Sequence, residues 1–192
     1  YNLIKEHRET LEVYKNKNVF LISAIFFLAC CAWVLLAGFG SPVFLVGGFI
    51  FGKWLGTFLV VFGLSCGATM LYAIANFFFK DLVEKKFSNK FYNLNQKFKK
   101  NEFIYFLIYR FVGGIPFFIS NILPTLFNIK IKNFFFGSII GMTPQLFVGV
   151  SLGAGLNKIL DKSNGPPSIF DLILTPEIYL PILGILILLI VG

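Results

Sequence analysis

Long apolar runs without a charged residue are the feature that most constrains this chain. The run at 19–39, VFLISAIFFLACCAWVLLAGF, and the run at 54–79 contain no Asp, Glu, Lys or Arg. At 1.5 Å per residue, about 20 helical residues cross a hydrocarbon core roughly 30 Å thick. The chain is only 14% charged, whereas soluble domains carry about 25% charged residues. The sequence therefore predicts an all-α membrane protein with one membrane domain.

Changes in polarity divide the chain into four predicted parts. These are a cytoplasmic N-terminal segment at 1–18, a membrane domain at 19–156, an external loop at 157–177 and a final transmembrane helix at 178–192. Within the membrane domain, we expect spanning helices at 19–39, 54–79 and 134–156. The predicted architecture is a polytopic helical bundle.

Two apolar segments of the membrane domain are poor candidates for a straight span. The run at 43–52 is shorter than the roughly 20 residues that a crossing helix needs. The stretch at 109–124, YRFVGGIPFFISNILP, places an arginine, a glycine pair and two prolines in an apolar sequence. Backbone that leaves the helical form at membrane depth needs protein or water as a hydrogen-bond partner. Both segments are therefore predicted to be re-entrant hairpins that meet at a protein-lined cavity.

Glycines and one proline are predicted to shape these hairpins and to kink the helix after them, because both residue types interrupt helices. They are Gly48, Gly52, Gly56, Gly113, Gly114 and Pro144.

The distribution of basic residues sets the predicted orientation. If both broken segments return to the face they left and the N-terminus is cytoplasmic, thirteen of the seventeen Lys and Arg residues lie inside. This bias is what the positive-inside rule describes. The two hairpins then enter from opposite faces, which is the inverted repeat of many transporters. We expect a multi-pass protein of the cell inner membrane, because the richness in Phe, Ile, Lys and Asn indicates an AT-rich bacterial genome.

Four hairpin residues are candidates for substrate binding: Arg110, Pro116, Asn121 and Lys53. An arginine inside an apolar segment is costly to insert and is a functional candidate by default. Its guanidinium group matches phosphate with two parallel hydrogen bonds, so we predict a site for an anionic group such as a lipid phosphate. Two alternatives stay open: Arg110 and Lys53 extend to the membrane surface, and Asn121 caps a broken helix.

The segment at 80–100 combines seven lysines with an apolar stripe at helical spacing. The stripe consists of Val83, Phe87, Phe91, Leu94 and Phe98. A basic helix with such a stripe is typical of a segment that lies among anionic lipid headgroups. The alternative is a helix that packs on the protein's own loops.

Two functions fit these features. The first is the translocation or scrambling of lipids, or of another anionic small substrate, with membrane lipids as partners. The second is a non-transporting scaffold that docks a partner through 80–100. No enzyme, metal or cofactor is expected, because His7 is the only histidine and the acidic residues lie near segment ends. No nucleic-acid partner is expected either, because the inside-facing loops account for the net charge of +8. The sequence indicates no oligomeric state.

The spacing of residues over 19–156 resembles the VTT domain of the DedA / SNARE-associated Golgi protein superfamily, in particular its Tvp/Tmem-type branch. In the second half, the resemblance rests on Arg110, Pro116, Asn121, Phe134, Gly141, Pro144 and Gly153. In the first half, it rests on Gly48, Gly52, Gly56, Gly63 and Gly67. The resemblance implies two opposed re-entrant hairpins and a role in lipid movement between leaflets or in small-molecule transport.

Overall fold

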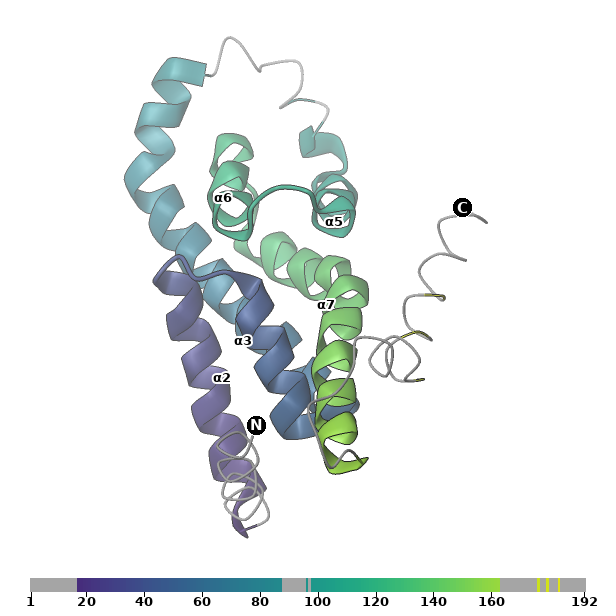
Figure 1. Cartoon of the computed structure of the whole chain (residues 1–192). Helices are drawn as coiled ribbons and strands as arrows, with labels where there is room; N and C mark the ends of the chain where they lie inside the picture. Colours follow the sequence, from purple (N-terminus) through teal and green to yellow (C-terminus); the bar gives the residue numbers. More distant parts are fainter. Residues whose placement is uncertain are drawn as a thin grey trace. The chain divides into compact units, whose positions relative to one another are not determined.

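The computed structural model describes residues 17–87 and 98–162, together with the single positions 96, 176, 179 and 183. Every regular element in these ranges is helical, so the prediction of an all-α chain is confirmed for the described residues (Figure 1). The elements are α2 (Val19–Leu35), α3 (Gly40–Phe87), α5 (Glu102–Val112), α6 (Phe117–Ile122), the 3-10 helix η1 (Leu123–Phe127) and α7 (Ile131–Lys162). Apart from the single positions, side chains are described over 17–79 and 98–157.

By length and composition, two helical stretches could cross a membrane: Gly40–Phe79 in α3, which is interrupted at Gly52, and Ile131–Asn157 in α7. The helix α2 is apolar as well, but it has 17 residues. It was predicted to reach residue 39 and ends earlier because Ala37 takes a left-handed conformation, with φ 61°, of the kind that terminates helices.

The helix α3 turns back on itself at Gly52, which has φ 75° and ψ −176°. Glycine adopts this conformation without the strain that a side chain would add. The element therefore consists of a first arm at 40–51 and a second arm that begins at residue 53. A Cβ atom built on Gly56 would lie 2.6 Å from the carbonyl oxygen of Gly47, so the two arms lie side by side near the turn. We call residues 40–60 the first hairpin.

The chain divides into two compact units. Unit 1 comprises Tyr1–Ala29, Ser41–Val60 and Pro144–Gly192, and unit 2 comprises Cys30–Gly40 and Val61–Thr143. The first hairpin therefore belongs almost entirely to unit 1, whereas the broken stretch at 109–124 belongs to unit 2.

Close approach of backbones characterises unit 1. A Cβ atom built on Gly48 would overlap the carbonyl oxygen of Val150, and one built on Gly153 would overlap the carbonyl oxygen of Leu45. The first arm of α3 thus packs on α7 at positions where only glycine fits. Small residues allow the same close contact between many membrane helices.

A stack of aromatic rings forms the centre of unit 2. Tyr72 of α3 lies parallel to Phe134 of α7, with ring centroids 4.3 Å apart. Phe134 in turn stacks on Phe106 of α5, with centroids 4.8 Å apart. All three side chains are fully buried, so the stack fixes α3, α5 and α7 around one apolar centre.

The predicted basic segment at 80–100 begins as a continuation of α3, which runs to Phe87. The side chains at 80–95 lie outside the described residues, and so does most of the predicted apolar stripe. Phe98, the last residue of that stripe, stacks on Phe127 with centroids 4.6 Å apart. At this position the alternative prediction, packing on the protein's own chain, describes the structure.

The ends of the chain carry three predicted parts that the structure covers only in small part. The N-terminal segment at 1–18 is described for its last two residues alone. The helix α7 continues to Lys162, beyond the point where the external loop at 157–177 was predicted to begin. Apart from single positions, the rest of that loop and the predicted final helix lie outside the described residues.

Candidate functional site

The stretch at 109–124 forms a helical break whose turn is built from glycines. The helix α5 ends at Val112, and Gly113 and Gly114 follow with φ values of 65° and 80°. These left-handed values favour glycine over any residue with a side chain. Pro116 then precedes α6 with φ −50°, close to the value that its ring imposes. We call α5, α6 and η1 the second hairpin; α5 and α6 are joined by a short loop in Figure 1.

Arg110 is the polar centre of the second hairpin. Its Nη1 donates a hydrogen bond to Ser120 Oγ at 3.1 Å, and its Nη2 donates to Asn121 Oδ1 at 2.8 Å. Its Cζ lies 5.2 Å from the ring centroid of Phe106 and 4.9 Å from that of Phe134, within the range of cation–π attraction. The residue is 3% exposed, so its side chain turns into the hairpin and does not extend to the surface.

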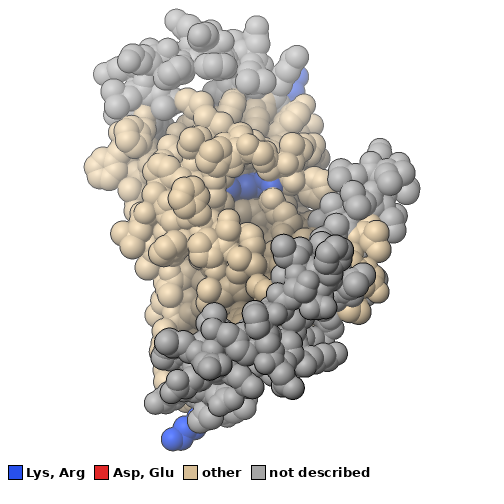
Figure 2. Space-filling model, in the orientation of Figure 1, with Lys and Arg blue, Asp and Glu red and all other residues tan. Residues whose placement is uncertain are grey.

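A small basic patch is visible at the bottom of a hollow over α5 and α6, the helices that hold Arg110 and its two partners (Figure 2). The surface around the hollow is uncharged in this view. In this view the hollow therefore has a positive group at its floor and an uncharged rim.

Asn121 and Ser120, both in α6, accept the hydrogen bonds of the Arg110 guanidinium group. Asn121 is 0% exposed, and its Nδ2 has no hydrogen-bond partner among the described residues. The Ser120 hydroxyl donates to the carbonyl oxygen of Phe117 at 2.7 Å, while its own carbonyl accepts from the Tyr109 hydroxyl at 3.3 Å. Neither end of α6 is capped by a side chain, so the predicted capping role of Asn121 is not what the structure has.

Polar contacts also close the base of the second hairpin. Glu102 Oε1 accepts hydrogen bonds from the backbone N–H of Lys130 at 2.7 Å and from Asn133 Nδ2 at 2.8 Å. This carboxylate ties the start of α5 to the start of α7, where a negative group also favours the helix dipole. Asn76 Nδ2 of α3 donates to Asn128 Oδ1 at 3.2 Å.

Sequence reasoning missed Ser120, although its position next to Asn121 and opposite Arg110 in a hairpin was a usable signal. It also missed two buried hydroxyl groups of unit 2, Ser65 on α3 and Ser138 on α7. Both are 0% exposed, and neither Oγ has a hydrogen-bond partner among the described residues. Nothing in their sequence context separates them from small packing residues.

The remaining predicted site residue, Lys53, lies in unit 1 and directly follows the turn at Gly52. Its Nζ is 5.3 Å from the ring of Trp54 and 5.7 Å from that of Phe147. The structure thus places Arg110, Asn121 and Pro116 in one hairpin of unit 2 and Lys53 in the other unit. Over the described part of the chain, no group of three or more His, Cys, Asp or Glu side chains is arranged to hold a metal ion.

The remaining helix-shaping residues have different surroundings. Gly56 packs against the first arm of α3, and nothing lies within 4 Å of a Cβ atom built on Gly114. Pro144 lies inside α7 at the division between the two units.

Comparison with known proteins adds to this geometry. The sequence pattern of the VTT domain matches residues 34–155. The chain is 32% identical over 177 residues to the transmembrane protein 41 homolog of Dictyostelium discoideum, covering 88% of this chain and 51% of that protein. It is 28% identical over 150 residues to YqeD of Bacillus subtilis, covering 76% of this chain and 69% of that protein.

A third relative is transmembrane protein 41B of Mus musculus, which is 24% identical over 158 residues, covering 79% of this chain and 53% of that protein. The chain thus spans about half of the length of the two transmembrane protein 41 relatives. No solved structure matches the chain.

Proposed function

The chain belongs to the VTT domain family, in its Tmem-type branch as the sequence predicted, and from this premise we propose that it translocates or scrambles an anionic substrate across the membrane. Lipids with a phosphate headgroup are the substrate class that the site fits best. The proposal extends to a multi-pass protein of the cell inner membrane with its N-terminus in the cytoplasm.

The observation that carries this proposal is the buried guanidinium group of Arg110. Its hydrogen bonds to the neutral side chains of Ser120 and Asn121 orient the group. A guanidinium group held in a fixed orientation is well suited to bind a phosphate oxygen pair. A charge at membrane depth is also rarely tolerated without a function.

Asn121 adds a second donor to the same site. Because an arginine only donates hydrogen bonds, the carboxamide must present its oxygen to Nη2 and keep its N–H₂ group for another acceptor. That group is buried and has no partner among the described residues. An oxygen of an anionic substrate would satisfy it, and this removes a cost of about 1–3 kcal/mol for a buried unpaired donor.

We further propose that both hairpins are re-entrant. With 11 residues in α5 and 6 in α6, each arm of the second hairpin is too short to cross a core roughly 30 Å thick. The first arm of α3 is similarly short. Two hairpins that enter from opposite faces would form an inverted repeat and would expose Arg110 to a substrate at membrane depth.

The test is lipid flipping in proteoliposomes that contain the full chain. Arg110→Ala is expected to lower the initial rate about tenfold or more, because a charge-assisted hydrogen bond contributes about 1.5–3 kcal/mol. The matched control is Phe111→Ala, which changes the neighbouring side chain of α5, 49% exposed. Equal rates for Arg110→Ala and the control, at equal amounts of inserted protein, would remove Arg110 from the mechanism.

The same assay separates the scaffold alternative. A chain that only docks a partner through 80–100 would give no flipping above protein-free liposomes. Its partner binding would be lost when Lys85, Lys86, Lys97 and Lys100 are changed to Gln, and it would be indifferent to Arg110. A translocator would show the reverse order of effects.

A further inference from the structure

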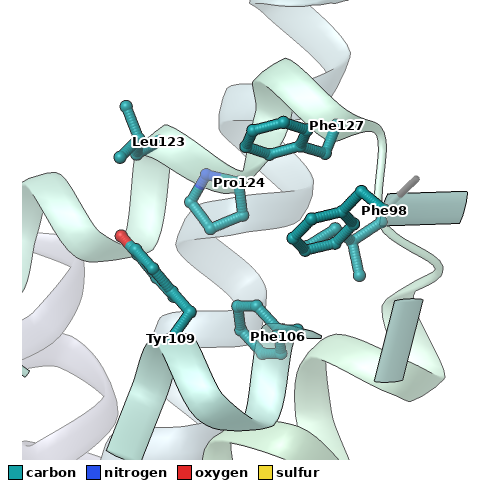
Figure 3. A pocket seen from close by; sticks show the side chains of 7 residues that line it. Phe98, Phe106, Tyr109, Leu123, Pro124 and Phe127 are labelled. Atoms are coloured by element: carbon teal, nitrogen blue, oxygen red, sulfur yellow. The ribbon is translucent and has the colours of Figure 1, made fainter. Parts of the chain in front are cut away.

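The second hairpin contains an apolar pocket that the proposed translocation site does not use. It lies in unit 2 and is lined mainly by aromatic side chains, among them Phe98, Phe106 and Phe127, with Leu123 and Ile129 completing the wall (Figure 3). Its volume is about 20 Å³, a little more than one water-sized group needs, so it can take only the end of an alkyl chain. An apolar cavity of this kind stays dry unless an apolar group fills it.

Three lysines directly follow residues that line this pocket. Phe98 is followed by Lys99 and Lys100, and Ile129 is followed by Lys130. All three lysines are exposed. They come from the two ends of the second hairpin, and Glu102 joins those ends by accepting a hydrogen bond from the backbone N–H of Lys130. Three exposed lysines are therefore chain neighbours of residues that line the apolar pocket.

We propose that the pocket and these lysines bind one anionic membrane lipid that stays in place and stabilises the second hairpin. The lipid phosphate contacts Lys99, Lys100 and Lys130, and the end of one acyl chain enters the pocket beside Phe106 and Leu123. Charge complementarity selects an anionic headgroup, because lysines near a membrane surface attract anionic lipids. The aromatic lining selects a ligand with an alkyl chain, which free phosphate lacks.

The bound lipid is distinct from the proposed transported substrate. Phe106 separates the two sites, since its ring lines the pocket and also lies 5.2 Å from Arg110 Cζ. A lipid in the pocket would restrain this ring and the guanidinium group beside it. The inference does not require that Arg110 bind a substrate, so either proposal can fail alone.

Native mass spectrometry of the detergent-solubilised full chain tests the inference. Phosphatidylglycerol is expected to remain bound at least about tenfold more strongly than phosphatidylcholine, because the three lysines attract its net negative charge. Inorganic phosphate at the same concentration is expected to give no retained adduct. Equal retention of the two lipids would overturn the proposal, and so would retention of inorganic phosphate, because the alkyl chain would then be unnecessary.

Two sets of variants locate the site. Leu123→Trp fills the pocket and is expected to lower phosphatidylglycerol retention to the phosphatidylcholine level, with the milder Leu123→Phe as a second variant should the first misfold. The matched control is Ile119→Trp, at a position of α6 that is 48% exposed. Unchanged retention in a folded Leu123 variant would contradict the pocket.

The contact with the lipid headgroup is tested with the triple variant Lys99→Gln, Lys100→Gln and Lys130→Gln. Its charge-matched control is Lys5→Gln, Lys15→Gln and Lys17→Gln. Retention is expected to fall about tenfold or more in the first triple variant alone. An equal fall in both would mean that the lipid responds to net charge and not to this site.

Discussion

The two hairpins reverse the chain in similar ways and are held by opposite means. Each turns at glycines with left-handed φ values, Gly52 in the first and Gly113 with Gly114 in the second. Beyond the turn, the first hairpin is fixed by backbone contacts at glycines, whereas polar side chains bridge the second across its arms and at its base.

This difference suggests different roles for the two hairpins. A contact between backbones leaves no room for a ligand, so the first hairpin acts as framework within unit 1. Polar side chains in an apolar setting are costly unless they are paired or bind something. Their concentration in the second hairpin is the reason why we propose this hairpin as the place where a substrate binds.

The largest effect is expected from Gly48→Ala in the first hairpin. The new methyl group would overlap the carbonyl oxygen of Val150, and backbone cannot move aside as a side chain can. We expect destabilisation of about 3 kcal/mol, the upper end for overpacking, measured as a lower Tm in detergent. Gly40→Ala is the control, because nothing lies within 4 Å of a Cβ atom at that position. Equal Tm values for the two variants would contradict the account of unit 1.

A smaller loss is expected when the polar base of the second hairpin is opened by Glu102→Ala. Two donors, the backbone N–H of Lys130 and the Asn133 side chain, lose their acceptor. Hydrogen bonds to a charged group contribute about 1.5–3 kcal/mol, so Tm should fall by less than in Gly48→Ala. Glu102→Gln keeps an acceptor oxygen and should recover most of the loss. If Glu102→Gln lowered Tm as much as Glu102→Ala, the stability of the hairpin base would not depend on the hydrogen bonds that Glu102 accepts.

The smallest effects are expected at the turns themselves. Gly52→Ala and Gly114→Ala place a side chain in open space but in a left-handed conformation, which costs about 1–2 kcal/mol. The two variants should lower Tm by similar amounts. The two hairpins differ in the contacts between their helices, whereas both turn at glycines with positive φ values. A much larger fall in Tm at either glycine would contradict this expectation, because it would mean that the turn itself makes stabilising contacts.

Much of this arrangement could be predicted from the sequence because breaks and charges are local signals. The interruptions at Gly52 and at Gly113–Gly114 follow from residue type, and an arginine in an apolar run stands out by its insertion cost. The partners of Arg110 were harder to identify. That Ser120 and Asn121 meet the guanidinium group depends on where the turn lies and on which face of α6 returns.

Other features could not be predicted, because they depend on contacts between residues that are far apart in the sequence or on burial. The smooth continuation of α3 to Phe87 runs through the start of a segment whose lysines indicated a separate surface helix. Asn121 reads as a cap by residue type, and only the position of Arg110 across the hairpin turns it into a hydrogen-bond acceptor. Ser65 and Ser138 become notable only through their complete burial.

The central claim is that the charge of Arg110 serves a substrate and does not merely hold the second hairpin together. The flipping rate of an anionic lipid in proteoliposomes carrying Asn121→Asp tests it most directly. A carboxylate at this position would pair with Nη2 and neutralise the site while keeping the hydrogen bond. The account predicts a Tm no lower than that of the unmodified chain together with a loss of flipping. Flipping at the unmodified rate in this variant would contradict it.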